Sequence, residues 1–523
     1  MNIQTNRPLL PFHPFLISLY PALALLAFNI KEIEPSAAYR ALLASFLLVG
    51  VMFLIFWAVT RSSARAALVS SLFAVLFFSY GHVYTVFKDV PVLGIVFGKQ
   101  SILSVIYLLL FVVGVFLIFR KLKDTRSLTA TMNFFALVLV ALPVFQIASS
   151  LFTFSRSAAL VAEKIPVENS LSAPAGQPLP DVYFIILDTY AGQGFLSEEL
   201  QFDNSAFIRQ LEDLGFVVMR CSQSNYVQTE LSLSSTLNLD YLSEIDPRYV
   251  AGYQDRSELP ALIKQSRVRR SLQELGYRTL SFGTGYSWSE IRDADIFYYP
   301  GNDGLLWLGN HAGLNQFEAM FIRTTGSLLL TTLKSSAIND LERVVDHPYK
   351  DHINIQLFVL DTLQRIPEVG GHKFVFAHLL IPHGPFVFGP DGVLLEDQMI
   401  GDKEPDGSDL QRDTFVKGFV PQVQYINGRM IPILKSLIED SDTPPIIIVQ
   451  GDHGPFSNPS VLNAYYLPGG EDIGLYPTIT PVNSFRLIFN AYFGTNYELL
   501  PDVSYSSTDA DPFGGEIFPN PCQ

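Results

Sequence analysis

Charged residues are scarce in this sequence, and their scarcity argues against a single soluble domain. Asp, Glu, Lys and Arg make up only 16% of the 523 residues, whereas hydrophobic residues make up 49%. The sequence also lacks internal repeats, and no small-residue cleavage site follows its first apolar stretch, which argues against a cleaved signal peptide. Cysteine is nearly absent: Cys221 and Cys522 could pair in an oxidising compartment, but their positions leave the pairing open.

The apolar residues concentrate in the first third of the chain, where they predict transmembrane helices. Five stretches each approach the roughly twenty residues that a helix needs to cross a bilayer. They are residues 15–30, 41–60, 66–87, 101–119 and 132–152, and the first is interrupted by a proline. Lys and Arg gather in the loops after the second and fourth stretches, so we expect these loops and the N-terminus in the cytoplasm. With five spans, the chain after about residue 155 would lie outside the cytoplasm.

The balance of charge changes at the same boundary. Residues 1–160 contain 12 Lys and Arg against 4 Asp and Glu, whereas the remaining residues contain 23 against 46. An acidic exposed part disfavours nucleic acid as a partner. A stretch rich in Ser and Pro follows the apolar region and predicts a linker. The predicted organisation is a transmembrane domain at 1–155, a linker at 156–180, a globular domain at 181–500 and a surface tail at 501–523.

The globular part alternates short apolar runs with helical stretches, which predicts an α/β domain with a mostly parallel central sheet. The strand-like runs are residues 181–187, 278–282, 373–380 and 445–449, and the main helical stretches are 204–214, 259–275 and 409–439.

Two of the predicted strands end at residues that commonly bind metal ions. One run leads into Asp452, His453 and Gly454, and another ends at Asp188. Ligands of open α/β sheets gather at the strand ends, so we expect these side chains to share one site. Carboxylate oxygen and imidazole nitrogen suit zinc or manganese. The alternative is that Asp452 and His453 only cap a turn.

Two further segments complete an ordered set of motifs: Thr229-Glu230-Leu231-Ser232 and His383-Gly384-Pro385. The set resembles the alkaline-phosphatase superfamily, and more narrowly its sulfatase-like branch, which contains lipoteichoic acid synthases, phosphoglycerol transferases and phosphoethanolamine transferases. The resemblance covers nearly the whole chain and includes the apolar spans followed by an exported catalytic domain. Residues 221–225 lack the Pro and Arg of the C/S-x-P-x-R motif, which disfavours a formylglycine sulfatase.

The resemblance implies a role for each motif. Thr229 would be the nucleophile, and His383 would contact the transferred group or act as a general acid. One divalent ion, zinc or manganese, would be bound by Asp188, Thr229, Asp452 and His453. From its own sequence context, Thr229 could instead be a plain helix cap.

The resemblance also suggests a substrate-contacting loop with an altered charge pattern. Lipoteichoic acid synthases bind glycerol phosphate through a Trp followed closely by an Arg. Here Trp288 is present, but the arginine is displaced to Arg292 with Glu290 between them. The candidate substrate-contacting residues are therefore Tyr286, Trp288, Arg292 and His383.

The other histidines match no motif. His378 lies within an apolar run and is predicted to be a core residue, with a role in the site as the alternative. Surface positions are predicted for His311, His347, His352 and His372. His82, near the outer end of the third apolar stretch, could contact a lipid head group or be an ordinary interfacial residue.

Together these features predict a multi-pass enzyme of a bacterial plasma membrane. It would take a phospho-alcohol group, of the phosphoglycerol or phosphoethanolamine type, from a membrane lipid donor and pass it to an envelope glycan or lipid. A hydrolase that uses the same site on phosphodiesters or phosphomonoesters is one alternative. A non-catalytic envelope-assembly protein is another, but it would require the complete set of metal-type residues to be vestigial.

Overall fold

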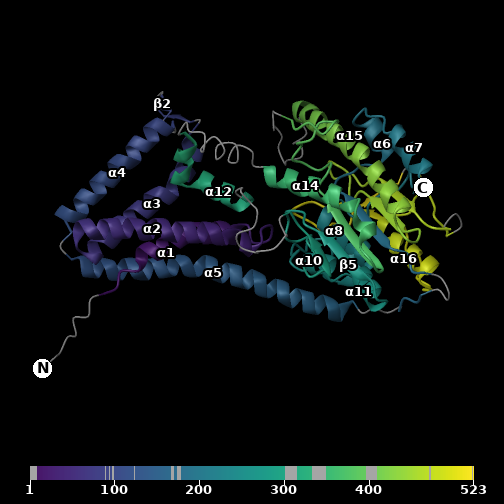
Figure 1. Cartoon of the computed structure of the whole chain (residues 1–523), viewed down its shortest axis with the longest axis horizontal. Helices are drawn as coiled ribbons and strands as arrows, with labels where there is room; N and C mark the ends of the chain where they lie inside the picture. Colours follow the sequence, from purple (N-terminus) through teal and green to yellow (C-terminus); the bar gives the residue numbers. More distant parts are fainter. Residues whose placement is uncertain are drawn as a thin grey trace. The chain divides into compact units, whose positions relative to one another are not determined.

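In the computed structural model the chain forms two compact units (Figure 1). The first unit contains Met1–Phe152 and Asn310–Asp351, and the second contains Thr153–Gly309 and His352–Gln523. The residues described by the structure are 9–88, 90–92, 95–96, 99–122, 124–165, 170–173, 178–300, 315–332, 349–395, 409–469, 473–520 and 522.

The first unit consists mainly of apolar helices, as the sequence predicts. Among the described residues, four helical segments are long and apolar enough to cross a membrane by length and composition, and α1 is a shorter apolar helix with Pro21 inside it. The helices are α1 (His13–Phe28), α2 (Tyr39–Thr60), α3 (Ser63–Phe87), α4 (Gln100–Arg120) and α5 (Thr125–Lys164). The helix α5 continues past residue 155, where the sequence predicts a linker to begin, and its residues from Thr153 onward belong to the second unit.

A segment from the middle of the globular sequence belongs to the first unit. It contains α12 (Gln316–Thr324) and the 3₁₀ helix η2 (Gly326–Thr332). Arg40, just inside α2, donates to Glu318 of α12 at 2.6 Å. The backbone of α12 approaches α3 so closely that a Cβ on Gly81 would lie 2.1 Å from the carbonyl oxygen of Arg323. This segment therefore packs against the apolar helices, and the predicted domain of residues 181–500 is interrupted by it.

The second unit is built on a seven-stranded sheet with the order β4-β9-β8-β3-β7-β5-β6. The five strands from β8 to β6 are parallel, whereas β9 and β4 add to one edge in antiparallel pairs. The strands are β3 (Val182–Leu187), β4 (Val217–Val218), β5 (Arg278–Phe282), β6 (Ile296–Tyr298), β7 (Lys373–Leu379), β8 (Ile446–Gln450) and β9 (Asn463–Tyr466). The central strands β3, β7 and β8 are buried along their whole length, as their apolar sequences predict.

Helices cover this sheet, and four of them contribute buried residues to the core on one of its faces (Figure 1). That face carries Val182, Phe184 and Ile186 of β3. It packs against α8 (Thr229–Asn238), α10 (Leu259–Lys264), α11 (Arg267–Glu274) and α16 (Pro481–Tyr492). The other helices of this unit include α7 (Ser205–Asp213), α14 (Lys350–Leu363) and α15 (Asp409–Glu439).

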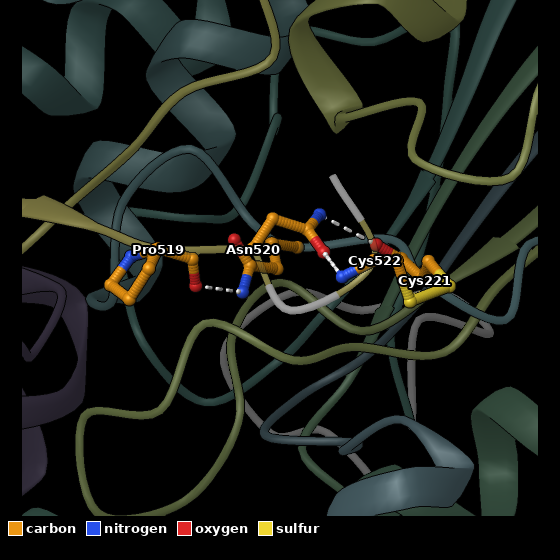
Figure 2. Close-up of a disulfide and its surroundings, with 5 residues drawn as sticks. Cys221, Pro519, Asn520 and Cys522 are labelled. Atoms are coloured by element: carbon orange, nitrogen blue, oxygen red, sulfur yellow. Dashed lines mark hydrogen bonds between the residues drawn. A yellow bond between two sulfur atoms is a disulfide. The ribbon is translucent and has the colours of Figure 1, made fainter.

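The C-terminal tail is fastened to the segment that leads into α8 (Figure 2). Cys221 and Cys522 form a disulfide across 301 residues of sequence, which answers the question that the sequence leaves open. The side chain of Asn520 donates to the carbonyl oxygen of Cys221 at 3.0 Å, and Gln223 donates to the carbonyl oxygen of Pro519 at 3.2 Å. Within the tail, β10 (Ser504–Tyr505) pairs with β11 (Ile517–Phe518).

Candidate functional site

Three neighbouring strands bring two carboxylates and an imidazole together. Asp188 directly follows β3, Asp452 follows β8 by two residues, and His378 lies in β7. Each of these buried side chains offers one ligand atom, and the three atoms lie within 4.8 Å of one another. The register of the sheet explains the position of His378, because it lies opposite Ile186 and a strand returns to the same face every two residues. His378 and Asp188 therefore share one face.

A glycine permits the close packing of these strand ends. A Cβ on Gly451 would lie 2.2 Å from the carbonyl oxygen of Tyr190, so only glycine fits at this position without movement. Thr189 then fixes one oxygen of each carboxylate. Its backbone N–H donates to Asp452 Oδ1 at 2.8 Å, and its hydroxyl donates to Asp188 Oδ1 at 2.9 Å.

The second oxygens of the two carboxylates have the character of cation ligands. Asp188 Oδ2 lies 3.2 Å from His378 Nε2. Asp452 is fully buried, and its Oδ2 receives no hydrogen bond from any residue that the structure describes. Burying a carboxylate oxygen without a donor is costly unless a cation offsets the charge. The donor set therefore fits a divalent metal ion.

The lowered pKa of Asp188 also favours a bound cation. Burial by itself would raise the pKa of Asp188, but the nearby rings of His383, His378 and His453 lower that pKa well below its usual value. Asp188 is consequently anionic at neutral pH, which is the form that binds a cation.

Thr229 begins α8 beside this cluster. Gln228 is the N-cap residue, and Thr229 occupies the first helical position, where its hydroxyl lies 3.2 Å from His453 Nε2. His453 Nδ1 lies 2.9 Å from the carbonyl oxygen of Gly454, which can only accept, so Nδ1 carries the proton and Nε2 accepts from Thr229 in a neutral ring. Ser232, one turn into α8, donates to the carbonyl oxygen of Asp452 at 2.7 Å. The start of α8, which favours anions, is thereby held against the strand ends.

His383 also lies beside the cluster. Its backbone N–H donates to the carbonyl oxygen of Asp188 at 3.2 Å, and Gln422 donates to the His383 carbonyl oxygen at 3.0 Å. His383 Nδ1 lies 2.5 Å from the carbonyl oxygen of Gly384, so its Nδ1 carries a proton and its Nε2 remains available for other contacts. The His383 ring is one of the groups that lower the pKa of Asp188.

The candidate substrate-contacting loop divides into two parts. The Trp288 ring lies 6.1 Å from the His378 ring and 6.3 Å from the Tyr286 ring, so these aromatic residues adjoin the cluster. Arg292 instead donates to Glu290 at 2.8 Å and lies over the ring of Phe297. Glu290 in turn accepts from the backbone of the same loop, which gives Arg292 a role in the shape of the loop.

Two histidines lie at the site although the sequence favoured other positions for them, the core for His378 and the surface for His352. His378 is buried, as predicted for a core residue, but it belongs to the cluster of possible metal ligands. His352 was predicted at the surface, yet its Nε2 is buried, and both His383 and Asp188 act on its pKa. Of the other histidines, His372 and His82 are exposed, whereas His311 and His347 lie outside the described residues.

Comparison with known proteins gave structural matches only. No protein-family model matches the chain, and no curated protein matches it. The chain is similar to the integral membrane protein lipooligosaccharide phosphoethanolamine transferase A from Neisseria meningitidis, with 13% sequence identity, 92% of this chain and 95% of that chain covered, and a TM-score of 0.38. It is also similar to the C-terminal periplasmic domain of a phosphoethanolamine transferase from Campylobacter jejuni, with 12% identity, 67% and 100% covered, and a TM-score of 0.34. Both are phosphoethanolamine transferases, one of the groups that the sequence motifs resemble.

Proposed function

We propose that this protein is a membrane-bound, metal-dependent phosphotransferase that moves a phospho-alcohol group from a lipid donor to an envelope glycan or lipid outside the cytoplasm. The main support is the meeting of Asp188, His378 and Asp452 beside the hydroxyl of Thr229 at the start of α8. The apolar helices support a membrane-held enzyme, since a tethered site meets a membrane-held donor at high effective concentration.

The ion would be held by the ligand atoms of Asp188, His378 and Asp452. The sequence motifs imply Thr229 and His453 as further ligands, and both lie beside this group. A bound zinc or manganese ion would polarise a phosphoryl oxygen and favour the ionised form of a coordinated hydroxyl.

The residues of the chain would carry the transfer itself. Thr229 Oγ1 attacks the phosphorus, forming a Thr229–phosphate ester while the bond from phosphorus to the lipid alcohol breaks. His453 Nε2, at 3.2 Å, is placed to accept the hydroxyl proton when it is not itself a ligand. His383 would donate a proton to the departing alcohol, and the start of α8 would stabilise the phosphoryl oxygens. Attack by an acceptor hydroxyl completes the transfer, whereas attack by water would make the protein a hydrolase.

Mass spectrometry after incubation with a phosphodiester lipid tests this proposal. We expect a covalent adduct on Thr229 whose mass identifies the transferred group. Thr229→Ala should lose both the adduct and turnover, and the loss should appear in kcat. Thr236→Ala, which removes a hydroxyl from the same helix, is the matched control and should keep both. His383→Ala should slow turnover by roughly 10²- to 10⁴-fold. Near-normal turnover by Thr229→Ala would disprove the covalent mechanism.

A further inference from the structure

One face of α14 carries two polar side chains that the proposed function does not use. His352 and Gln356 are four residues apart, so they lie on the same side of the helix. Gln356 Oε1 accepts the backbone N–H of Leu380 at 2.9 Å, which holds α14 against the segment between His378 and His383. This face of α14 therefore lies next to the candidate active site.

A second contact places α14 beside the aromatic loop. A Cβ on Gly285 would lie 3.6 Å from Ile355 Cδ1, so Ile355 of α14 lies close to the residue that precedes Tyr286. The same loop places Trp288 next to His378. The helix, the aromatic loop and the end of β7 thus adjoin one another at the strand ends, where Asp188, His378 and Asp452 lie.

Two side-chain nitrogens on this face have no hydrogen-bond partner among the described residues. Both His352 Nε2 and Gln356 Nε2 are buried, and neither has a hydrogen-bond partner among the residues that the structure describes. Burial lowers the pKa of His352 to about 3, with a further lowering by His383 and an opposing effect of Asp188. The ring is therefore neutral and lies within electrostatic range of two site residues. Buried polar groups without partners are destabilising, so a ligand that supplies acceptors would offset this cost.

We propose that His352 and Gln356 form a phosphoryl-binding subsite, in which their Nε2–H groups donate hydrogen bonds to the non-bridging oxygens of the substrate phosphate. Phosphoryl oxygens only accept hydrogen bonds, as these two donors require, whereas a sugar hydroxyl would also need an acceptor. The role of the subsite in transfer rests on the proposed function, but binding of inorganic phosphate can be measured without any turnover.

The test measures the Kd of inorganic phosphate by calorimetry, using full-length Thr229→Ala protein loaded with zinc or manganese, in which no covalent adduct can form. His352→Phe should weaken phosphate binding about 10-fold or more, because a hydrogen bond to a charged group is lost. His352→Gln should restore most of the affinity, since its amide keeps an N–H at a similar position. His372→Phe removes an exposed histidine and should leave the Kd unchanged.

A second variant, at position 356, tests the subsite even if substitutions of His352 prevent folding. Gln356→Glu keeps an oxygen for the Leu380 N–H and places a carboxyl group where we expect the phosphate, so it should also weaken phosphate binding. If either variant binds phosphate with the Kd of the Thr229→Ala protein and has the same circular dichroism spectrum, the subsite proposal is wrong. If binding depends on His352 but no adduct forms on Thr229, the transferase proposal fails and the subsite stands. If an adduct forms on Thr229 but the two substitutions leave phosphate binding unchanged, the subsite proposal fails and the transferase proposal stands.

Discussion

At the scale of single residues, Gly451 controls how closely the strand ends approach. Gly451→Ala should displace Asp452, because the added Cβ would lie 2.2 Å from the carbonyl oxygen of Tyr190 and one of the two backbones must move. We expect a destabilisation of about 1 to 3 kcal/mol, as for other overpacked sites, together with reduced metal binding. Unfolding midpoints and elemental analysis measure the two effects.

Gly428 provides the matched control for this substitution. It lies within α15, and a Cβ there would meet nothing within 4 Å. Gly428→Ala should therefore be neutral or slightly stabilising, because alanine favours the helix over the unfolded chain. If Gly451→Ala were as stable as Gly428→Ala and kept its metal, the packing argument for residues 451–452 would be wrong.

The ligand set itself gives a second prediction at this scale. Protein purified without chelator should contain about one ion per chain, and the site should prefer zinc or manganese to calcium, which requires more oxygen ligands. His378→Ala should lower the bound metal, because it removes one of the three clustered ligand atoms. Elemental analysis of parent and variant measures this. A parent that binds no zinc or manganese even when these ions are added would contradict the metal site.

The residues that the sequence could identify are those next to strand ends or inside motifs. The ordered motifs indicated Asp188, Thr229 and Asp452, which the structure brings to the same region. His378 and His352 carried no such signal. The position of His378 depends on the register between β3 and β7, and that of His352 depends on how α14 packs. Both are set by tertiary contacts between residues far apart in the chain.

At the scale of elements, the C-terminal tail holds the segment that precedes α8. The backbone N–H of Tyr505 donates to the carbonyl oxygen of Asn225 at 2.9 Å, and the Asn225 side chain donates back to Val503 at 2.9 Å. The Asn225 side chain also accepts from Val482 of α16 at 2.8 Å. The tail is thus part of the support for the start of α8, whereas the sequence suggested a surface appendage.

Loss of the disulfide should therefore weaken this support. We expect Cys522→Ser to lower the free energy of unfolding by an amount on the order of 2 to 5 kcal/mol, since the bridge closes a long loop. It should also lower kcat, because the segment that positions Thr229 loosens. Melting curves and turnover of the variant, compared with the parent in the presence and absence of reductant, measure both effects. A parent insensitive to reductant and a variant with the parent melting point would contradict the prediction.

The sequence predicted the long, buried elements and missed those defined by capping or by distant partners. The runs at 182–187, 373–379 and 446–450 are strands, as their apolar sequences predict. The helix predicted at 259–275 is divided into α10 and α11, because the Ser266 side chain caps a new helix by accepting from the backbone of Arg269. The return of α12 to the first unit could not be anticipated, since the partner of Glu318 is 278 residues away.

At the scale of the whole molecule, the positive loops argue for one orientation of the second unit. Arg61 and Arg65 lie between α2 and α3, and Arg120, Lys121 and Arg126 lie around the turn between α4 and α5. If both loops are cytoplasmic, the chain that follows α5 lies outside, whether or not α1 crosses the membrane. The side of the membrane on which the acidic second unit lies thus depends on the spans from α2 to α5.

The position of the N-terminus depends on α1 alone. This helix has 16 residues, which corresponds to about 24 Å at 1.5 Å per residue, less than the roughly 30 Å of a typical bilayer core. A reporter active only outside the cytoplasm should work when fused after residue 180 and fail when fused at Lys121. Fused ahead of α1, it should fail if α1 crosses, as the predicted cytoplasmic N-terminus requires. Activity at Lys121 with none after residue 180 would put the second unit in the cytoplasm and exclude an envelope substrate. If the reporter is active ahead of α1 and the other two results are as expected, α1 does not cross the membrane and the second unit still lies outside the cytoplasm.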